Sequence, residues 1–124
     1  MSIEDTPSII LPEKSGIYKH IQVVIGGKDF IRFETEEYIH GEILEELLKK
    51  TRTEFQVLEN MDGENIPLEK GSNYELVGAG WINLDLENKE GIFYKFSRDY
   101  QKRTSEAHLE RIRKKLNDWK LKKE

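Results

Sequence analysis

The side chains that most often carry chemistry are few in this sequence and far apart. Histidine occurs three times, as His20, His40 and His108, and cysteine does not occur. The chain therefore has no disulfide and no thiolate metal site, and no two histidines have the HExxH spacing of a zinc-binding helix. His40 stands at the entry to a predicted helix, where a lone histidine is usually a capping or surface residue. We predict no metal site and no bound cofactor.

A group of glutamates between residues 34 and 46 is the best source of an acid/base pair. An exposed acidic helix face is a far commoner arrangement, and nothing in the pattern marks one of these carboxylates as buried. The phosphate-loop motif GxxxxGK[ST], the dinucleotide motif GxGxxG and the esterase motif GxSxG do not occur. We therefore predict no catalytic residue and no enzymatic activity. The glutamates are Glu34, Glu36, Glu37, Glu42, Glu45 and Glu46.

The sequence Gly78-Ala79-Gly80 superficially resembles a phosphate-binding loop. The residues after it, Trp81–Leu86, alternate between apolar and polar as a strand does, so the helix N-terminus that would bind an anion is missing. Glycines inside a strand pattern typically mark a bulge, a bend or a tight connection. We predict that these glycines interrupt a strand that begins at Tyr74 and that their role is structural.

Charge is distributed unevenly along the chain. Residues 1–99 carry 11 Lys/Arg and 20 Asp/Glu, which gives a net charge of −9. Residues 100–124 carry 9 Lys/Arg and 4 Asp/Glu, which gives +5, and the net charge of the chain is −4. An acidic body repels phosphate groups, which argues against a general nucleic-acid binder. The basic tail could still contact an acidic partner.

This basic tail is predicted to be an amphipathic helix. Ser105 is a suitable N-cap, and Leu109, Ile112, Leu116 and Trp119 follow as an apolar stripe at helical spacing. The stripe could pack on the domain's own sheet, or it could bind a partner protein or a second copy of the chain. A third possibility is contact with nucleic acid or another anionic surface through basic side chains. These are Lys102, Arg103, Arg111, Arg113, Lys114 and Lys115.

The elements that must position these residues begin with a hairpin and a helix over His20–Thr51. The hairpin combines a strand over Tyr18–Ile25, the turn Gly26-Gly27 and a strand over Lys28–Thr35, because paired glycines favour the positive φ angles of a two-residue turn. A helix is predicted over Ile39–Thr51 from its apolar face, with acidic residues near its start and basic residues near its end.

Shorter elements follow. Strands are predicted over Glu54–Glu59 and Tyr74–Val77, with a short extended edge piece at Ile66–Leu68. A further hairpin is predicted from Trp81–Leu86 and Ile92–Phe96. The chain is thus predicted to hold an irregular leader (1–17), an α+β domain (18–97) and the basic C-terminal helix (98–124).

This order of elements is similar to that of the ubiquitin-like β-grasp fold. The segments IQVVIGGKDFIRF, IHGEILEELL and FQVLENMDGENIPLEKGSNYELVG, within residues 20–86, resemble the prokaryotic multiubiquitin-type domains. The resemblance implies a β-grasp-like mixed sheet (ββαββ), here with an added C-terminal β-hairpin and a C-terminal amphipathic helix. Such modifiers are conjugated through an exposed C-terminal Gly-Gly. Conjugation is not implied here, because the chain ends in LKKE and Gly78 and Gly80 lie in mid-chain.

We therefore expect a small cytoplasmic, non-enzymatic protein-interaction module. It would bind a protein partner or a second copy of itself through a sheet face or edge and through the stripe of Leu109, Ile112, Leu116 and Trp119. The alternative is a nucleic-acid-associated accessory protein that uses the basic helix. No membrane contact is expected, because no apolar run approaches the roughly 20 residues of a membrane span.

Overall fold

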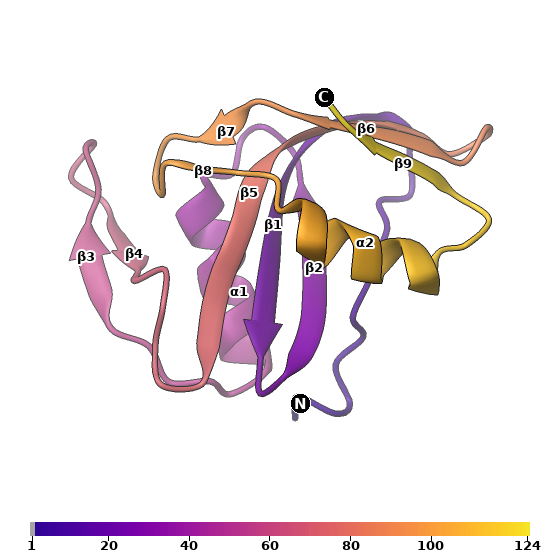
Figure 1. Ribbon diagram of the computed structural model, residues 1–124. Helices are drawn as coiled ribbons and strands as arrows, with labels where there is room; N and C mark the ends of the chain where they lie inside the picture. Colours follow the sequence, from indigo (N-terminus) through magenta and orange to yellow (C-terminus); the bar gives the residue numbers. More distant parts are fainter. Residues whose placement is uncertain (1) are drawn as a thin grey trace.

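A five-stranded mixed sheet and two helices form the α+β fold in the computed structural model, which describes residues 2–124 (Figure 1). The strand order is β2-β1-β5-β6-β9, and neighbouring strands are antiparallel except β6 and β9, which are parallel. Two small hairpins, β3–β4 and β7–β8, lie outside this sheet. The elements are β1 (Gly16–Ile25), β2 (Lys28–Glu34), α1 (His40–Lys50), β3 (Val57–Glu59), β4 (Asn65–Pro67), β5 (Tyr74–Asp85), β6 (Glu90–Tyr94), β7 (Phe96–Ser97), β8 (Lys102–Arg103), α2 (Glu106–Lys115) and β9 (Lys120–Lys123).

The predicted hairpin and first helix are confirmed. Gly26 and Gly27 both have positive φ, at 55° and 81°, as the two-residue turn between β1 and β2 requires. In α1 the side chains of the predicted apolar face are buried: Ile43, Leu44, Leu47 and Leu48. At the start of α1 the Glu42 carboxylate accepts a hydrogen bond from the Ile39 backbone N–H. The predicted third strand and edge piece are present as the shorter hairpin β3–β4.

The central strand β5 is longer than predicted. It runs without interruption from Tyr74 to Asp85, so the predicted break at Gly78-Ala79-Gly80 is wrong. The predicted bulge is present instead, because the pairing of β1 with β5 shifts between Gln22, opposite Gly78, and Val23, opposite Leu76. A side chain at position 78 would overlap the side chain of Gln22, which explains the glycine there.

The C-terminal segment differs most from its prediction. The helix ends at Lys115, and residues Lys120–Lys123 form β9 parallel to β6, so a single helix to the end of the chain is wrong. The backbone N–H of Lys120 donates to the Lys89 carbonyl in the β5–β6 turn, and the Lys89 ammonium bonds the Asp118 carboxylate at 2.6 Å. Leu121 is buried between exposed neighbours, which is the pattern of a strand with one covered face.

The N-terminal segment is irregular, as predicted, but it is tied to the edge of β2. Ile9 bridges to Ile31 and packs against the second core. The Lys28 ammonium donates to the carbonyl oxygens of Ile3, Glu4 and Thr6. Gly16 and Ile17, predicted to belong to the leader, are the first residues of β1.

Two separate cores lie on opposite faces and at opposite ends of the long strands. On one face, α1 packs on residues that include Ile21, Val23 and Leu76. On the other face, α2 packs on residues that include Ile82 and Phe93. Figure 1 shows α1 behind the sheet and α2 in front of it.

The length of α1 decides how much of its sheet face is covered. Its 11 residues span about 16 Å, whereas the 12 residues of β5 span about 40 Å. The helix therefore leaves a large part of this face uncovered.

The α+β class and the mixed sheet are thus as predicted, whereas the β-grasp arrangement is not confirmed. The two central strands, β1 and β5, pair antiparallel from Gly16–Leu84 to Ile25–Tyr74. Within residues 2–124, neither helix is long and apolar enough to cross a membrane.

Candidate functional site

The predicted apolar stripe lies in the chain's own second core. Leu109 and Ile112 are fully buried, and Leu116 and Trp119 are partly buried against the same cluster, which also holds Phe93. Of the three roles considered for the stripe, the structure therefore places it in packing against its own sheet. A partner could reach Leu109 only after α2 had left the sheet.

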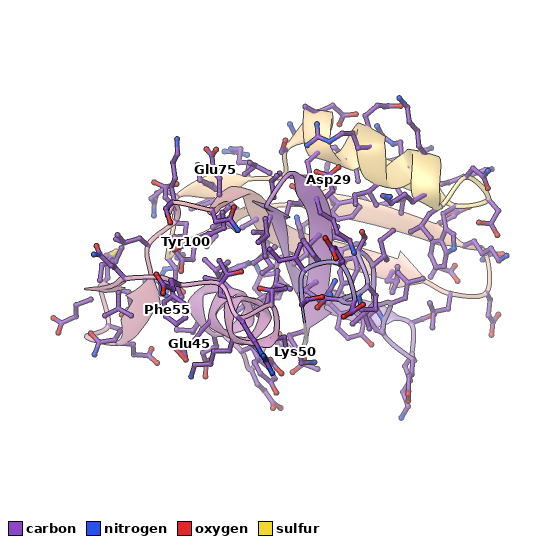
Figure 2. The ribbon with its side chains drawn as sticks, turned by 90° about the horizontal axis from the view of Figure 1, so that it is seen from below. Asp29, Glu45, Lys50, Phe55, Glu75 and Tyr100 are labelled. Atoms are coloured by element: carbon purple, nitrogen blue, oxygen red, sulfur yellow. The ribbon has the colours of Figure 1, made fainter. Side chains whose placement is uncertain are left out.

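Most of the predicted basic side chains already have partners within the chain. Lys102 pairs with Glu69 at 2.9 Å, and Arg113 pairs with Glu110 at 2.8 Å. Arg111 donates two hydrogen bonds to the Asp29 carboxylate, at 2.8 and 3.0 Å. Figure 2 shows Asp29 beside α2. Arg103 lies over the ring of Phe96, while Lys114 and Lys115 are exposed. On α2, Arg111 and Arg113 are therefore paired with carboxylates, and Lys114 and Lys115 remain as exposed cations.

All three histidines are buried, which the sequence pattern did not reveal. His40 was predicted to be a surface or capping residue, but its Nε2 lies 2.8 Å from the Gly80 carbonyl oxygen. His20 Nε2 lies 3.3 Å from Thr104 Oγ1, and His108 Nε2 lies 3.4 Å from the Val23 carbonyl oxygen. Burial lowers the pKa of His40 and of His108, and burial with repulsion from His40 lowers the pKa of His20 to about 3. These groups are neutral near pH 7.

A polar clamp joins the start of α2 to the sheet. The Gln22 side chain accepts a hydrogen bond from the Ser105 backbone N–H at 2.7 Å and donates one to the Ser105 carbonyl at 3.1 Å. The clamp needs Gly78, because a Cβ there would also lie 2.6 Å from the Ser105 nitrogen. Among residues 2–124, no group of three or more His, Cys, Asp and Glu side chains is placed to hold a metal ion. The two Gln22–Ser105 hydrogen bonds attach the start of α2 to the sheet.

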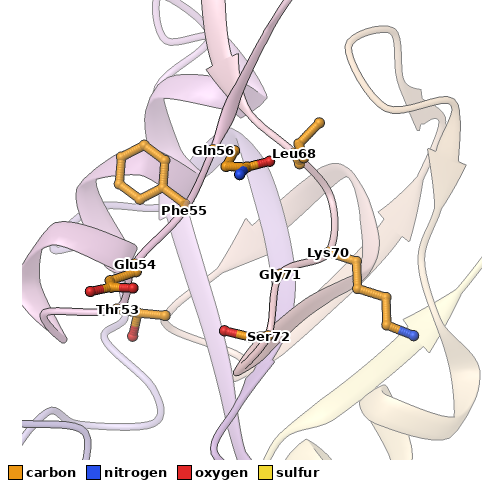
Figure 3. A pocket seen from close by; sticks show the side chains of 8 residues that line it. All are labelled: Thr53, Glu54, Phe55, Gln56, Leu68, Lys70, Gly71 and Ser72. Carbon is orange, nitrogen blue, oxygen red and sulfur yellow. The ribbon is translucent and has the colours of Figure 1, made fainter.

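A wide groove lies beside the base of the β3–β4 hairpin, with a volume of about 640 Å³. Figure 3 shows its lining, two extended segments over residues 53–56 and 68–72. Glu54 and Lys70 are the charged side chains of this lining, and they lie on different segments. Nothing in the lining pairs a nucleophile with a base, so the groove does not indicate catalysis.

The most distinctive surface is the part of the α1-side sheet face that α1 leaves uncovered, here called the open face. The helix begins where His40 contacts the Gly80 carbonyl, and β5 continues beyond this point to Asp85. Two rows of cross-strand neighbours form the open face. The first row is Lys19, Trp81 and Tyr94, and the second row is Ile17, Asn83, Ile92 and Lys122.

The open face combines apolar groups with cations. Ile17 is 52% exposed and Ile92 is 40% exposed, and Phe96 of β7 is 42% exposed. The ammonium groups of Lys19 and Lys95 lie 5.3 and 5.4 Å from the centre of the Trp81 ring, within the range of a cation–π interaction.

Two backbone features place Lys95 over Trp81. Lys95 has the left-handed conformation, with φ 57°, which costs a residue other than glycine about 1–2 kcal/mol. Gly80 lets the bend at Lys95 approach β5 closely, because a Cβ at position 80 would lie 2.9 and 3.0 Å from the carbonyl oxygens of Tyr94 and Lys95.

A small cavity of about 120 Å³ adjoins the open face at the start of α1. Its lining includes Trp81, Phe96 and Arg98, together with the Asp99 carboxylate. Asp99 is already used in the fold, because it accepts hydrogen bonds from the Gly41 backbone N–H and from the Asn60 side chain. The open face was foreseen only in general terms, as a sheet face available to a partner.

Comparison with known proteins finds no matching family model and no matching curated protein. The resemblance of residues 20–86 to multiubiquitin-type domains therefore stays a prediction.

Proposed function

We propose that this chain is a non-enzymatic protein-interaction module and that the open face is its binding surface. The observation that carries the proposal is the exposure of Ile17 and Ile92, on strands whose opposite face is packed against α2. Phe96 of β7 is also exposed and lines a cavity with Lys19 and Trp81. Single exposed apolar residues are ordinary, whereas several gathered on one face beside cationic and polar groups favour an interaction site.

The apolar content of the open face is enough to support binding. Full burial of an isoleucine or phenylalanine side chain is worth about 1.5–3 kcal/mol, so covering three half-exposed ones contributes about 2–4 kcal/mol. Aromatic residues near the centre of a contact patch often carry a large share of the affinity, and Trp81 and Tyr94 occupy that position here. The proposal requires no rearrangement of α2.

Binding of a single-stranded nucleic acid is the second candidate function. It is favoured by the rings of Trp81 and Tyr94 beside lysine ammonium groups, because bases stack on aromatic side chains while cations hold the backbone. The net charge of −4 opposes it, and so do the carboxylates of Glu36 and Glu124, which together with burial raise the pKa of Tyr94. The protein partner is therefore the first candidate.

Photochemical crosslinking tests the proposal and separates the two candidates. Asn83 is exposed at the centre of the open face, and it can be replaced by the photoreactive amino acid p-benzoylphenylalanine in the full chain. Glu75 is a matched control position, because it is exposed on the same strand and lies near the other end (Figure 2). Each crosslinked product is identified by mass spectrometry and formed again with the purified component.

A nuclease-resistant protein adduct is expected from position 83 and not from position 75. It should disappear when Ile17→Glu or Ile92→Glu places a charge in the apolar row. An adduct of twice the chain mass would identify a second copy as the partner. An adduct that nuclease removes would establish the second candidate instead, and the lack of any adduct from position 83 would overturn both.

A further inference from the structure

We infer that Lys19, Trp81 and Lys95 form the charged anchor of the open face and receive a carboxylate side chain of an acidic partner segment. This inference rests on the proposed function, because it names the chemistry of the partner that the open face would bind. Three observations carry it: among residues 2–124 neither lysine forms a salt bridge, both ammonium groups lie over the Trp81 ring, and the exposed side chains of Ile17 and Ile92 lie in the next row.

The two ammonium groups are not neutralised within the described part of the chain. Five cations elsewhere have carboxylates within salt-bridge distance: Lys49, Lys89, Lys102, Arg111 and Arg113. Among residues 2–124, neither Lys19 nor Lys95 forms such a pair, although the chain as a whole is acidic. Two positive charges close to one indole, without a carboxylate partner, therefore form a local positive site on a protein of net negative charge.

The site is also held in place before any partner arrives. The Lys19 ammonium donates a hydrogen bond to the Tyr38 carbonyl oxygen at 2.7 Å while it lies over Trp81. The left-handed backbone of Lys95 and its close approach to Gly80 set the direction of the Lys95 side chain, whose ammonium lies over the Trp81 and Tyr94 rings. Left-handed residues other than glycine are enriched at binding sites, and a fixed side chain loses less entropy on binding than a mobile one.

The surroundings select a carboxylate on a protein segment over a chain of phosphates. Ile17 and Ile92 lie in the next row and favour aliphatic side chains beside the bound anion. Glu36 and Glu124 act on Tyr94 electrostatically, and they would repel a polyanion that ran across the face. A single carboxylate at the Lys19–Trp81–Lys95 group meets less of this repulsion than a chain of phosphates does.

The fluorescence of Trp81 can be used to measure binding at this site. The chain has two tryptophans, and Trp119→Phe leaves Trp81 as the single fluorophore. The probe is a short peptide with one glutamate among valines and neutral polar residues, and the comparison probes are the same peptide with glutamine for glutamate and an oligodeoxythymidine. The glutamate peptide is expected to bind at least about tenfold more tightly than the glutamine peptide, and its affinity should fall as NaCl rises from about 0.05 to about 0.5 M.

Two lysine variants test where the glutamate carboxylate of the peptide binds. Lys95→Asn removes the charge and keeps the left-handed backbone, which asparagine tolerates. Lys114→Asn is the matched control, because Lys114 is an exposed lysine on α2, which covers the opposite face of the sheet. We expect Lys95→Asn to weaken binding of the glutamate peptide about fivefold and Lys114→Asn to leave it unchanged.

Several results would overturn the inference. These are no saturable change in Trp81 fluorescence with the glutamate peptide, equal affinity for the glutamine peptide, an equal effect of the two lysine variants, or tighter binding of the oligodeoxythymidine. The proposed function is decided separately by the adduct from position 83. If that adduct forms and depends on Ile17 but not on Lys95, the partner is a protein and the acidic anchor is wrong.

Discussion

Protonation of His20 is expected to destabilise the fold as the pH falls. The imidazole is fully buried, and burial with repulsion from His40 lowers its pKa to about 3. In the unfolded chain the same group has the ordinary histidine pKa of about 6.5. Between these two values the unfolded chain binds more protons than the folded one. The free energy of unfolding is therefore highest above about pH 6.5 and decreases as the pH falls through this window.

The size of the effect follows from the two pKa values. Each pH unit below about 6.5 lowers the free energy of unfolding by about 1.4 kcal/mol. Protonation of His20 alone therefore lowers it by about 2.7 kcal/mol between about pH 7.5 and pH 4.5. His40 and His108 act in the same direction, because burial lowers their pKa values as well. Small domains are stable by about 5–15 kcal/mol, so this is a large part of the total.

Urea unfolding at about pH 7.5, 6 and 4.5 measures the effect in the wild-type chain and in His20→Gln, which has no titrating group at this position. The stability of the wild-type chain relative to the variant should fall by about 2.7 kcal/mol across this range. An NMR titration of the imidazole provides the control. If His20 titrates near pH 6.5 in the folded protein, or if both proteins show the same pH slope, the argument from burial is refuted.

Three substitutions test the packing of α2. Gly78→Ala should lower the free energy of unfolding by about 3 kcal/mol, because the methyl group would displace Gln22 from the Ser105 backbone and leave buried polar groups unpaired. Urea denaturation measures this change, and an unchanged midpoint would contradict the role of the Gln22–Ser105 hydrogen bonds. Leu109→Ala should lower it by about 2–5 kcal/mol in the same assay, whereas a partner surface that is not part of the core would leave stability unchanged. Asp29→Asn should lower the free energy of local opening of α2 by about 1–2 kcal/mol, because its hydrogen bonds to Arg111 are lost. Amide hydrogen exchange should become faster in α2 but not in α1, and an equal change in both helices would argue against a local role.

The parts of the fold that the sequence predicts well are those set by local patterns. The Gly26-Gly27 turn fixes its own hairpin, and the spacing of Ile43, Leu44, Leu47 and Leu48 is enough to define α1 and its buried face. The bulge at Gly78 also had a local signal, namely glycine inside a strand pattern.

The parts that could not be predicted depend on contacts between distant segments. Leu116 and Trp119 continue the helical spacing of Leu109, so the pattern gives no sign that the helix stops at Lys115. The competing strand β9 forms because β6 offers a free edge, and that edge exists only in the folded sheet. The open face is likewise set by the length of α1 relative to β5, and its members come from strands far apart in sequence.

The division of the interior into two cores has a consequence for the cooperativity of unfolding. The first core takes its helical residues from α1 and the second takes them from α2, so the two halves are joined mainly through the ladder of β1 and β5. The register shift between Gln22 and Val23 lies inside the first core, because Ile21 and Ala79 on one side of it and Val23 and Leu76 on the other all belong to that core. Since each helix stabilises a different core, we expect the half that holds α2 and β9 to open under mild destabilisation while the hairpin and α1 stay folded, which makes this small chain two units of partly independent stability.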